Sequence, residues 1–225
     1  MAVLKLPSKA KKKRRIAFFK KIGFISLGAL ALFTVIILAL NYNKFFITDV
    51  EVVGTEAINQ EVIKANVLNT LSEKYFYLIP KKNLLFYPKN KIKMDLSNSS
   101  KRIKNISVGY KNIRDLHTVV IKIEERTPSY LWCHESSDKK ECYFVDDKGY
   151  IFDIAPNFSE NVYITLYGKL IGGGKEIIGK TFLSEDEFLE LSKIIYRTSS
   201  IGVISPSVIK KDDSDYELDL ARGGK

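Results

Sequence analysis

The longest apolar segment of the chain covers residues 22–43, which carry no charged side chain and are bounded by Lys21 and Lys44. As a helix, residues 22–40 are long enough to cross the hydrocarbon layer of a bilayer, about 30 Å thick. A buried helix of a soluble domain rarely stays uncharged over such a length. A cleaved signal peptide has a shorter apolar core, of about 7–15 residues, and a small-residue cleavage site that does not follow this segment. We therefore predict a transmembrane helix over residues 22–43.

After this segment, apolar positions recur with a period of two, which is typical of a strand with one buried face. In residues 48–53, valines alternate with acidic residues, and Gly54 ends the run. A helix should follow over residues 59–71, because the Asn59 side chain can cap its first turn. Its buried face is expected to carry Val62, Ala65 and Leu68 or their neighbours.

A second, weaker helix and two further strands complete this region. Residues 89–100 place Ile92 and Leu96 on one helical face, and residues 106–111 and 119–124 again alternate apolar with polar positions. The order strand, helix, helix, strand, strand predicts a three-stranded sheet covered on one face by two helices. We assign this β-α-α-β-β domain to residues 45–126, in a chain of the α+β class.

Between the two helices, residues 74–93 mix aromatic and basic side chains, and Pro80 and Pro88 prevent one long helix. The rings have two interpretations. The first, which we expect, is that the rings close the core of the domain. The second is that they lie at the level of the lipid headgroups, where aromatic rings and lysines are both favourable. The rings belong to Tyr75, Phe76, Tyr77, Phe86 and Tyr87.

Residues 127–225 form a second region of short apolar runs separated by turns. Cys133 and Cys142 flank a predicted hairpin tip at residues 136–140, so a disulfide would close its base; two unpaired structural thiols are the alternative. The turn at residues 146–149 supplies a glycine for a positive φ.

A helix should begin at the capping box of Ser184 and Glu187 and extend to about Arg197. The predicted strands around it make this region a mainly antiparallel β domain with one helix. These strands cover residues 162–170, 203–204, 208–211 and 216–220.

Charge sets the expected orientation. Residues 1–21 hold nine basic and no acidic side chains, whereas the rest of the chain holds 27 basic and 26 acidic ones, a net charge of +1. Basic residues beside a first membrane helix stay in the cytoplasm. We therefore predict a basic cytoplasmic tail at residues 1–21, with everything from Phe45 onward outside the cytoplasm. A nucleic-acid-binding tail is the weaker interpretation, because no aromatic residue interrupts the cations before Phe18.

Catalytic chemistry has few candidate residues. The chain contains two histidines, His117 and His134, and its two cysteines have neither the spacing of a redox site nor that of a zinc knuckle. We find no serine or cysteine placed with a base and an acid, and we expect no catalytic residue, metal or cofactor. A membrane-anchored envelope enzyme remains the alternative from another class.

Three segments, in this order, resemble a known family. Residues 48–54 read TDVEVVG, similar to a V-x-V-x-G start. Residues 118–128 read TVVIKIEERTP, similar to a T-L-x-I-x-V-x-E-R-x-P strand, and residues 143–152 read YFVDDKGYIF, similar to a V-D-x-x-G hairpin. With the basic tail and the single apolar helix, this set resembles the FtsQ/DivIB cell-division proteins, whose extracytoplasmic part begins with a POTRA domain. The matching motif residues are Gly54, Glu125, Arg126, Pro128, Asp146 and Gly149.

The resemblance implies a non-enzymatic, single-pass protein of the plasma (inner) membrane that acts in septum formation. Its implied partners are small bitopic coiled-coil proteins of the FtsB/DivIC and FtsL type, with no nucleic acid and no small-molecule substrate. A proline that often precedes the last POTRA strand is replaced by Leu116. The alternative within binding proteins is a POTRA protein of envelope assembly or transport.

In the resembling family, further strands follow the last one predicted here and accept a partner segment by strand addition. We therefore expect this chain to be either incomplete at its C-terminus or unusually short. The last predicted strand then supplies the candidate partner-binding residues, Tyr216, Leu218 and Leu220.

Overall fold

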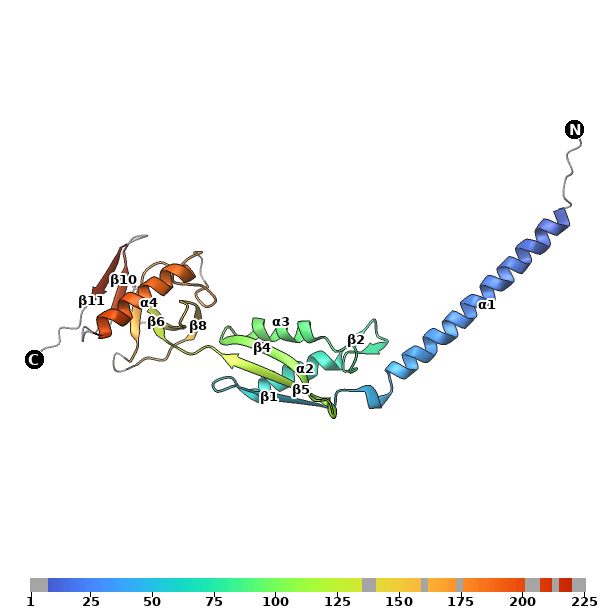
Figure 1. Cartoon of the computed structure of the whole chain (residues 1–225), viewed down its shortest axis with the longest axis horizontal. Coiled ribbons are helices and arrows are strands. Elements are labelled where there is room, and N and C mark those ends of the chain that lie inside the picture. Colours follow the sequence, from blue (N-terminus) through green and yellow to red (C-terminus); the bar gives the residue numbers. More distant parts are fainter. Residues whose placement is uncertain are drawn as a thin grey trace, which may run out of the picture. The chain divides into compact units, whose positions relative to one another are not determined.

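The computed structural model describes residues 8–134, 141–158, 162–172, 176–200, 207–211 and 215–219 (Figure 1). In these residues it is a mixed α+β structure with an N-terminal apolar helix. By its contacts the chain divides into two compact units, and the boundary between them crosses the long strands of the first sheet. One unit comprises Met1–Glu51, Lys64–Lys89 and Gly109–Val119, and the other comprises Val52–Ile63, Asn90–Val108 and Val120–Lys225.

The N-terminal helix, α1 (Ser8–Leu40), is continuous over 33 residues. Its part Lys12–Leu40 is long and apolar enough to cross a membrane, and its apolar side chains are exposed. The helix begins before the predicted residues 22–43, because the lysines and arginines that precede the apolar segment are good helix formers. It ends at Leu40, and a short 3-10 helix (Asn43–Phe45) leads to the first strand.

The first sheet contains three strands, as predicted, and their order in the sheet is β1-β5-β4. Its central strand buries every second side chain at Val119, Ile121 and Ile123, which confirms the predicted alternation. Two short strands, β2 and β3, form a separate hairpin. The bounds are β1 (Asp49–Val53), β2 (Lys74–Tyr75), β3 (Ile79–Pro80), β4 (Ile103–Asn112) and β5 (Asp115–Glu125).

Two helices, α2 (Gln60–Ser72) and α3 (Lys89–Ser99), lie between β1 and β4 in the chain. Asn59 Oδ1 accepts a hydrogen bond from the Glu61 N–H at 2.9 Å, so the cap of α2 forms as predicted. In α3, Ile92 and Leu96 are buried, as predicted. In α2 the buried stripe is carried by neighbours of the named residues, because Ile63, Val67 and Leu71 are buried whereas Val62, Ala65 and Leu68 are exposed.

The expectation that the aromatic rings of residues 74–93 close the core is wrong for most of them. Tyr87 is buried and packs edge-on against Tyr110 with ring centroids 5.3 Å apart. Burial raises the pKa of both hydroxyls. Phe76, Tyr77 and Phe86 are exposed instead, because the β2–β3 turn and the loop after it carry them away from the core.

The second sheet has the order β11-β10-β9-β6-β7-β8. Among its described strands, β6–β9 and β9–β10 are parallel and the other three pairs are antiparallel. Most strand pairs are therefore antiparallel, as predicted, but the two parallel pairs make the sheet mixed. A helix carries the chain from β9 to β10, and such a crossover produces parallel neighbours. The bounds are β6 (Tyr130–Cys133), β7 (Cys142–Val145), β8 (Ile151–Ile154), β9 (Ile164–Tyr167), β10 (Ser207–Lys210) and β11 (Tyr216–Asp219).

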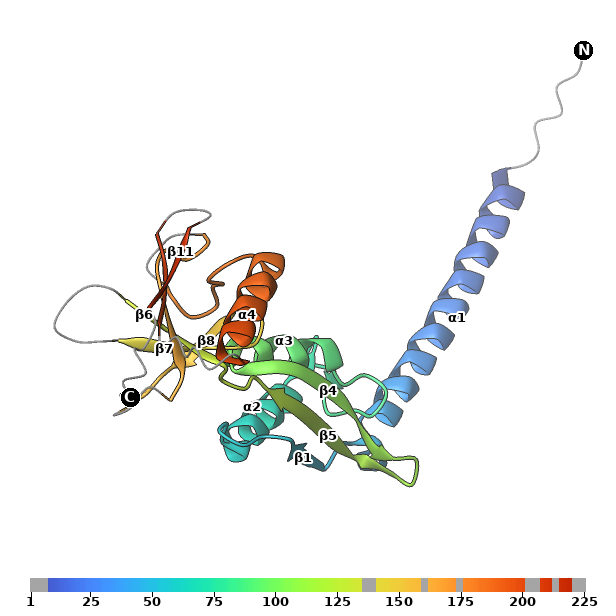
Figure 2. The same cartoon turned by 60° about the vertical axis from the view of Figure 1, so that its left-hand side comes forward.

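The crossover helix, α4 (Glu185–Ser200), packs against this sheet (Figure 2). It buries Phe188, Leu191 and Ile195, as predicted. The capping box is present: the Ser184 Oγ donates to Glu187 Oε2 at 2.7 Å, and the Glu187 N–H donates to Ser184 Oγ at 3.4 Å. The hydrogen bond from the Ser184 side chain lowers the pKa of Glu187. The predicted strand at residues 203–204 lies outside the described residues.

Replacing Ser184 by alanine is expected to raise the pKa of Glu187 toward its ordinary value and to remove about 1 kcal/mol of N-cap stabilisation. A carboxylate whose pKa is lowered by folding stabilises the fold above its unfolded pKa and loses that contribution as the pH falls. As the pH is lowered, the stability of the variant should therefore fall less than that of the unsubstituted chain. An NMR titration of Glu187 in the detergent-solubilised chain tests this, with Ser192→Ala in the same helix as the control; an unchanged Glu187 titration would contradict it.

Candidate functional site

The end of β5 places a carboxylate against the backbone that leads into α2. Glu125 Oε1 accepts hydrogen bonds from the N–H groups of Glu56 at 2.8 Å and Ile58 at 3.0 Å. The Ala57 N–H lies 3.2 Å from both carboxylate oxygens. Unpaired N–H groups near the start of a helix favour an anion in this position. Glu125 therefore fastens the segment between β1 and α2 to the end of β5.

The next residue, Arg126, forms a second network. Its guanidinium makes an ion pair with the Asp146 carboxylate and lies 4.2 Å from the centroid of the Tyr150 ring. Asp146 is only 2% exposed, and its Oδ1 accepts the N–H groups of Lys148 and Tyr150, both at 2.9 Å. A buried carboxylate requires partners of this kind. We call Arg126, Asp146 and Tyr150 the motif clasp.

Gly149 completes the turn that the motif clasp holds. Its φ is +80°, and a Cβ there would come within 2.6 Å of the Phe188 ring, which is buried. Tyr130, at the start of β6, packs edge-on against the same ring, and burial raises the pKa of its hydroxyl. Pro128 lies in the irregular segment 126–129 between β5 and β6. Glycine at position 149 is thus required by close packing as well as by backbone conformation.

Five of the six motif residues belong to two sets of contacts. Gly54 begins the β1–α2 connection, and Glu125, at the end of β5, accepts hydrogen bonds from its backbone. Arg126, Asp146 and Gly149 hold the turn after β7, whereas Pro128 belongs to neither set. These contacts fix the backbone of two turns. In the part of the chain that the structure describes, no group of three or more His, Cys, Asp or Glu side chains is arranged to hold a metal ion.

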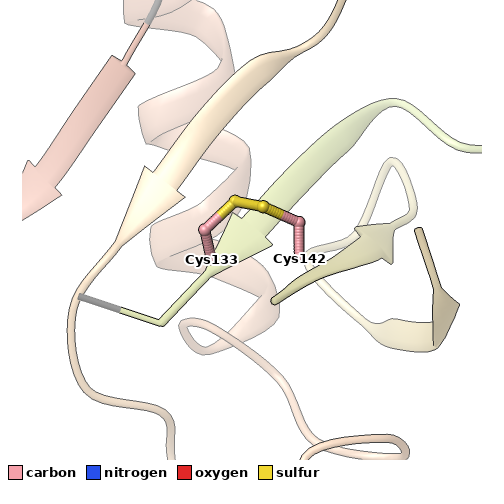
Figure 3. Close-up of a disulfide and its surroundings, with 2 residues drawn as sticks. All are labelled: Cys133 and Cys142. Carbon is pink, nitrogen blue, oxygen red and sulfur yellow. A yellow bond between two sulfur atoms is a disulfide. The ribbon is translucent and has the colours of Figure 1, made fainter. Parts of the chain in front are cut away.

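Cys133 of β6 and Cys142 of β7 are direct cross-strand partners, and their sulfur atoms are bonded (Figure 3). The Cα atoms lie 4.2 Å apart, and Cys133 is buried. The predicted tip at residues 136–140 lies outside the described residues. The bond closes a short loop at the ends of both strands.

Replacing both cysteines by serine is expected to lower the free energy of unfolding by about 2–3 kcal/mol, the loop-entropy contribution for a loop of this length. The cysteines are separated by nine positions. Thermal unfolding of the detergent-solubilised chain with and without reductant checks this. Reductant should lower the Tm of the unsubstituted chain and leave the Tm of Cys133→Ser/Cys142→Ser unchanged. Equal sensitivity of both chains to reductant would contradict the prediction.

The last described strand, β11, lies at one edge of the second sheet and carries two of the three candidate partner-binding residues. Tyr216 and Leu218 pack, partly buried, against the core of this domain, and Glu217 is exposed between them. Leu220 lies outside the described residues. A partner strand added here would therefore bind mainly through the backbone edge of β11.

Sequence reasoning did not identify Arg102, which is a further partner of the motif segment. Its backbone oxygen accepts the Arg126 N–H at 2.8 Å, and its guanidinium lies 2.8 Å from Asp153 Oδ2. The same group lies 5.3 Å from the centroid of the Phe152 ring. Arg102 and Asp153 are 51 positions apart, and no local pattern in the sequence indicates such a pair.

Compared with protein-family models and with the curated proteins, the sequence gives no match.

Proposed function

We propose that this chain is a non-enzymatic, single-pass membrane scaffold of septum assembly, of the FtsQ/DivIB type. Its N-terminus would lie in the cytoplasm, and the residues from Phe45 onward would lie outside it. The observation that carries the proposal is the ordered set of motif residues. In the structure, Glu125 and Arg126 each contribute to a distinct network that holds a turn, which is a reason for the glutamate–arginine pair to occur at the end of β5.

Assignment of residues 45–126 to a POTRA-like domain is part of this proposal. It is supported by the strand and helix order β1-α2-α3-β4-β5 directly after α1, with the small β2–β3 hairpin inserted between the helices. The three-stranded sheet with β5 at its centre also supports it. The second sheet, from β6 to β11, would then be the partner-binding domain.

In this proposal α1 holds the protein at the division septum, and the sheet edge at β11 binds a segment of a small bitopic division protein of the FtsB/DivIC or FtsL type. Strand addition supplies affinity through backbone hydrogen bonds and specificity through alternate side chains. Glu217 is an exposed side chain of this edge strand.

Photo-crosslinking in dividing cells tests the proposal. A photoreactive amino acid replaces Glu217 on β11 or, as the control, Glu190 on the exposed face of α4, in the full-length protein. We expect mass spectrometry to identify small bitopic coiled-coil proteins crosslinked at position 217 and not at position 190. Crosslinks to outer-membrane or secretion components at position 217 would overturn the division function and favour an envelope-assembly protein.

A further inference from the structure

The tip of the β2–β3 hairpin presents two aromatic rings to its surroundings. Phe76 is 89% exposed and Tyr77 is 94% exposed, and Leu85 in the following loop is 73% exposed. We call Phe76 and Tyr77 the aromatic tip. Contiguous apolar side chains that stay exposed in a folded chain mark an interaction surface.

The backbone of the aromatic tip is strained. Phe76 and Tyr77 have φ angles of 48° and 63°, and the Leu78 N–H donates to the Tyr75 oxygen at 3.0 Å across the turn. Tight turns with positive φ normally carry asparagine or glycine, and bulky residues are outliers there. Residues strained in this way persist where the surrounding structure holds them, and they cluster at functional sites. Two aromatic residues therefore occupy positions that the local backbone disfavours.

The hairpin is fastened to the C-terminal end of α1, and both belong to one compact unit. The Asn41 Nδ2 donates to the Leu78 oxygen at 3.0 Å, and the buried Asn83 donates through Nδ2 to the Leu40 oxygen at 2.8 Å. Figures 1 and 2 show the hairpin beside this end of α1. When α1 spans a bilayer, these hydrogen bonds hold the hairpin at the surface where the helix emerges.

Basic side chains occur at the base of the hairpin and in the 3-10 helix after α1. Lys44, Lys74 and Lys82 are exposed, whereas Lys81 is paired with Glu73. Lys82 Nζ lies 4.4 Å from the centroid of the Phe46 ring. Aromatic rings and lysine side chains together are typical of the membrane–water interface, where the ammonium groups contact lipid phosphates.

We propose that the aromatic tip inserts into the interfacial layer of the bilayer that α1 spans, on the side where α1 ends, with the exposed lysines on lipid phosphates. This rests on the proposed membrane span of α1. The occupant of the surface is lipid, because the hairpin is hydrogen-bonded to the end of the helix that would leave the bilayer. The tip then acts as a second anchor that fixes the orientation of the first domain against the membrane.

Fluorescence quenching in vesicles tests the insertion. Full-length Tyr77→Cys, with Cys133 and Cys142 disulfide-bonded, carries an environment-sensitive dye in vesicles of phosphatidylethanolamine and phosphatidylglycerol. We expect quenching by lipids with a nitroxide at the headgroup or the upper acyl chain, and protection from aqueous iodide. Tyr196→Cys on α4, an exposed aromatic position, is the control and should show the reverse pattern. A Leu32→Cys label in α1 should be quenched by nitroxides deep in the acyl chains.

The outcomes separate the two proposals. Quenching at position 32 with iodide-accessible dye at position 77 overturns the insertion and leaves the membrane span in place. No lipid quenching at position 32 overturns the span and, with it, the insertion. Disulfide-linked dimers of Tyr77→Cys in place of lipid quenching would assign the surface to a second copy of the chain and overturn the lipid assignment.

A second variant separates insertion from folding. Phe76→Asn/Tyr77→Gly gives the turn the residues that its backbone prefers, so the Tm in detergent should equal or exceed that of the unsubstituted chain. A dye at Leu78→Cys is then compared in chains with and without these two substitutions. Nitroxide lipids should quench the dye beside the unsubstituted tip and should quench it less beside the substituted one. Unchanged lipid quenching would overturn the role of the two rings.

Discussion

Replacing Asp146 by asparagine is expected to lower the free energy of unfolding by about 3 kcal/mol, because the substitution leaves the Arg126 guanidinium without its carboxylate. Asparagine can keep the two hydrogen bonds from the Lys148 and Tyr150 N–H groups, so the loss reports mainly on the ion pair. The Arg126 side chain is 18% exposed, and its buried Nε has no hydrogen-bond acceptor in the described structure. Urea unfolding of the detergent-solubilised full-length chain, followed by circular dichroism, measures the difference.

Two further variants make this test specific. Arg126→Met/Asp146→Asn removes both charges and should be less destabilised than the sum of its single substitutions, because no uncompensated charge remains. Glu185→Gln breaks the exposed ion pair with Lys148 and should change stability by less than about 1 kcal/mol. Equal losses in Asp146→Asn and Glu185→Gln would contradict a structural role for the motif clasp.

Local periodicity predicted those elements in which one face alone is apolar. Val119, Ile121 and Ile123 alternate along β5 and therefore lie on one face of the strand, and all three side chains are buried. In α2 the apolar positions form two overlapping stripes, one starting at Val62 and one at Ile63. Only packing against the rest of the domain selects between them, which is why sequence reasoning named the wrong residues and had to include their neighbours.

Strand direction and contacts between residues distant in the sequence could not be predicted from local patterns. The parallel pairing of β9 with β10 follows from the path of α4, which local alternation does not determine. The spacing of the motif residues identified them in the sequence, but it did not predict which residues they contact. Arg126 and Asp146 are 20 positions apart, and the Glu125 acceptor lies 67 positions from the Ile58 N–H.

The aromatic residues of segment 74–93 show a further limit of prediction from local sequence. Aromatic rings suit both a core and a membrane surface, so composition alone left two interpretations open. In the structure, Phe76 and Tyr77 lie in a turn with positive φ and are exposed, whereas Tyr87 is buried in the core. No residue at the tip is of the type that predicts such a turn.

Replacing Gly54 by alanine is expected to lower the free energy of unfolding by roughly 3 kcal/mol, through a steric clash and a strained backbone. The φ of Gly54 is +84°, and a Cβ there would lie 2.2 Å from the Ile123 carbonyl oxygen. That oxygen belongs to the central strand, whose buried side chains hold it in place, so β1 must move instead. The movement would pull the following turn away from the Glu125 carboxylate.

Gly109 provides the matched control, because it lies in β4 and a Cβ there meets nothing within 4 Å. Gly109→Ala should change stability by no more than about 0.5 kcal/mol. Urea unfolding of both variants in the same detergent makes the comparison, and equal values would contradict the packing argument. A large loss confined to Gly54→Ala would mean that this motif glycine is required for the close approach of β1 to β5. Its place in the motif would then follow from the fold of the first domain.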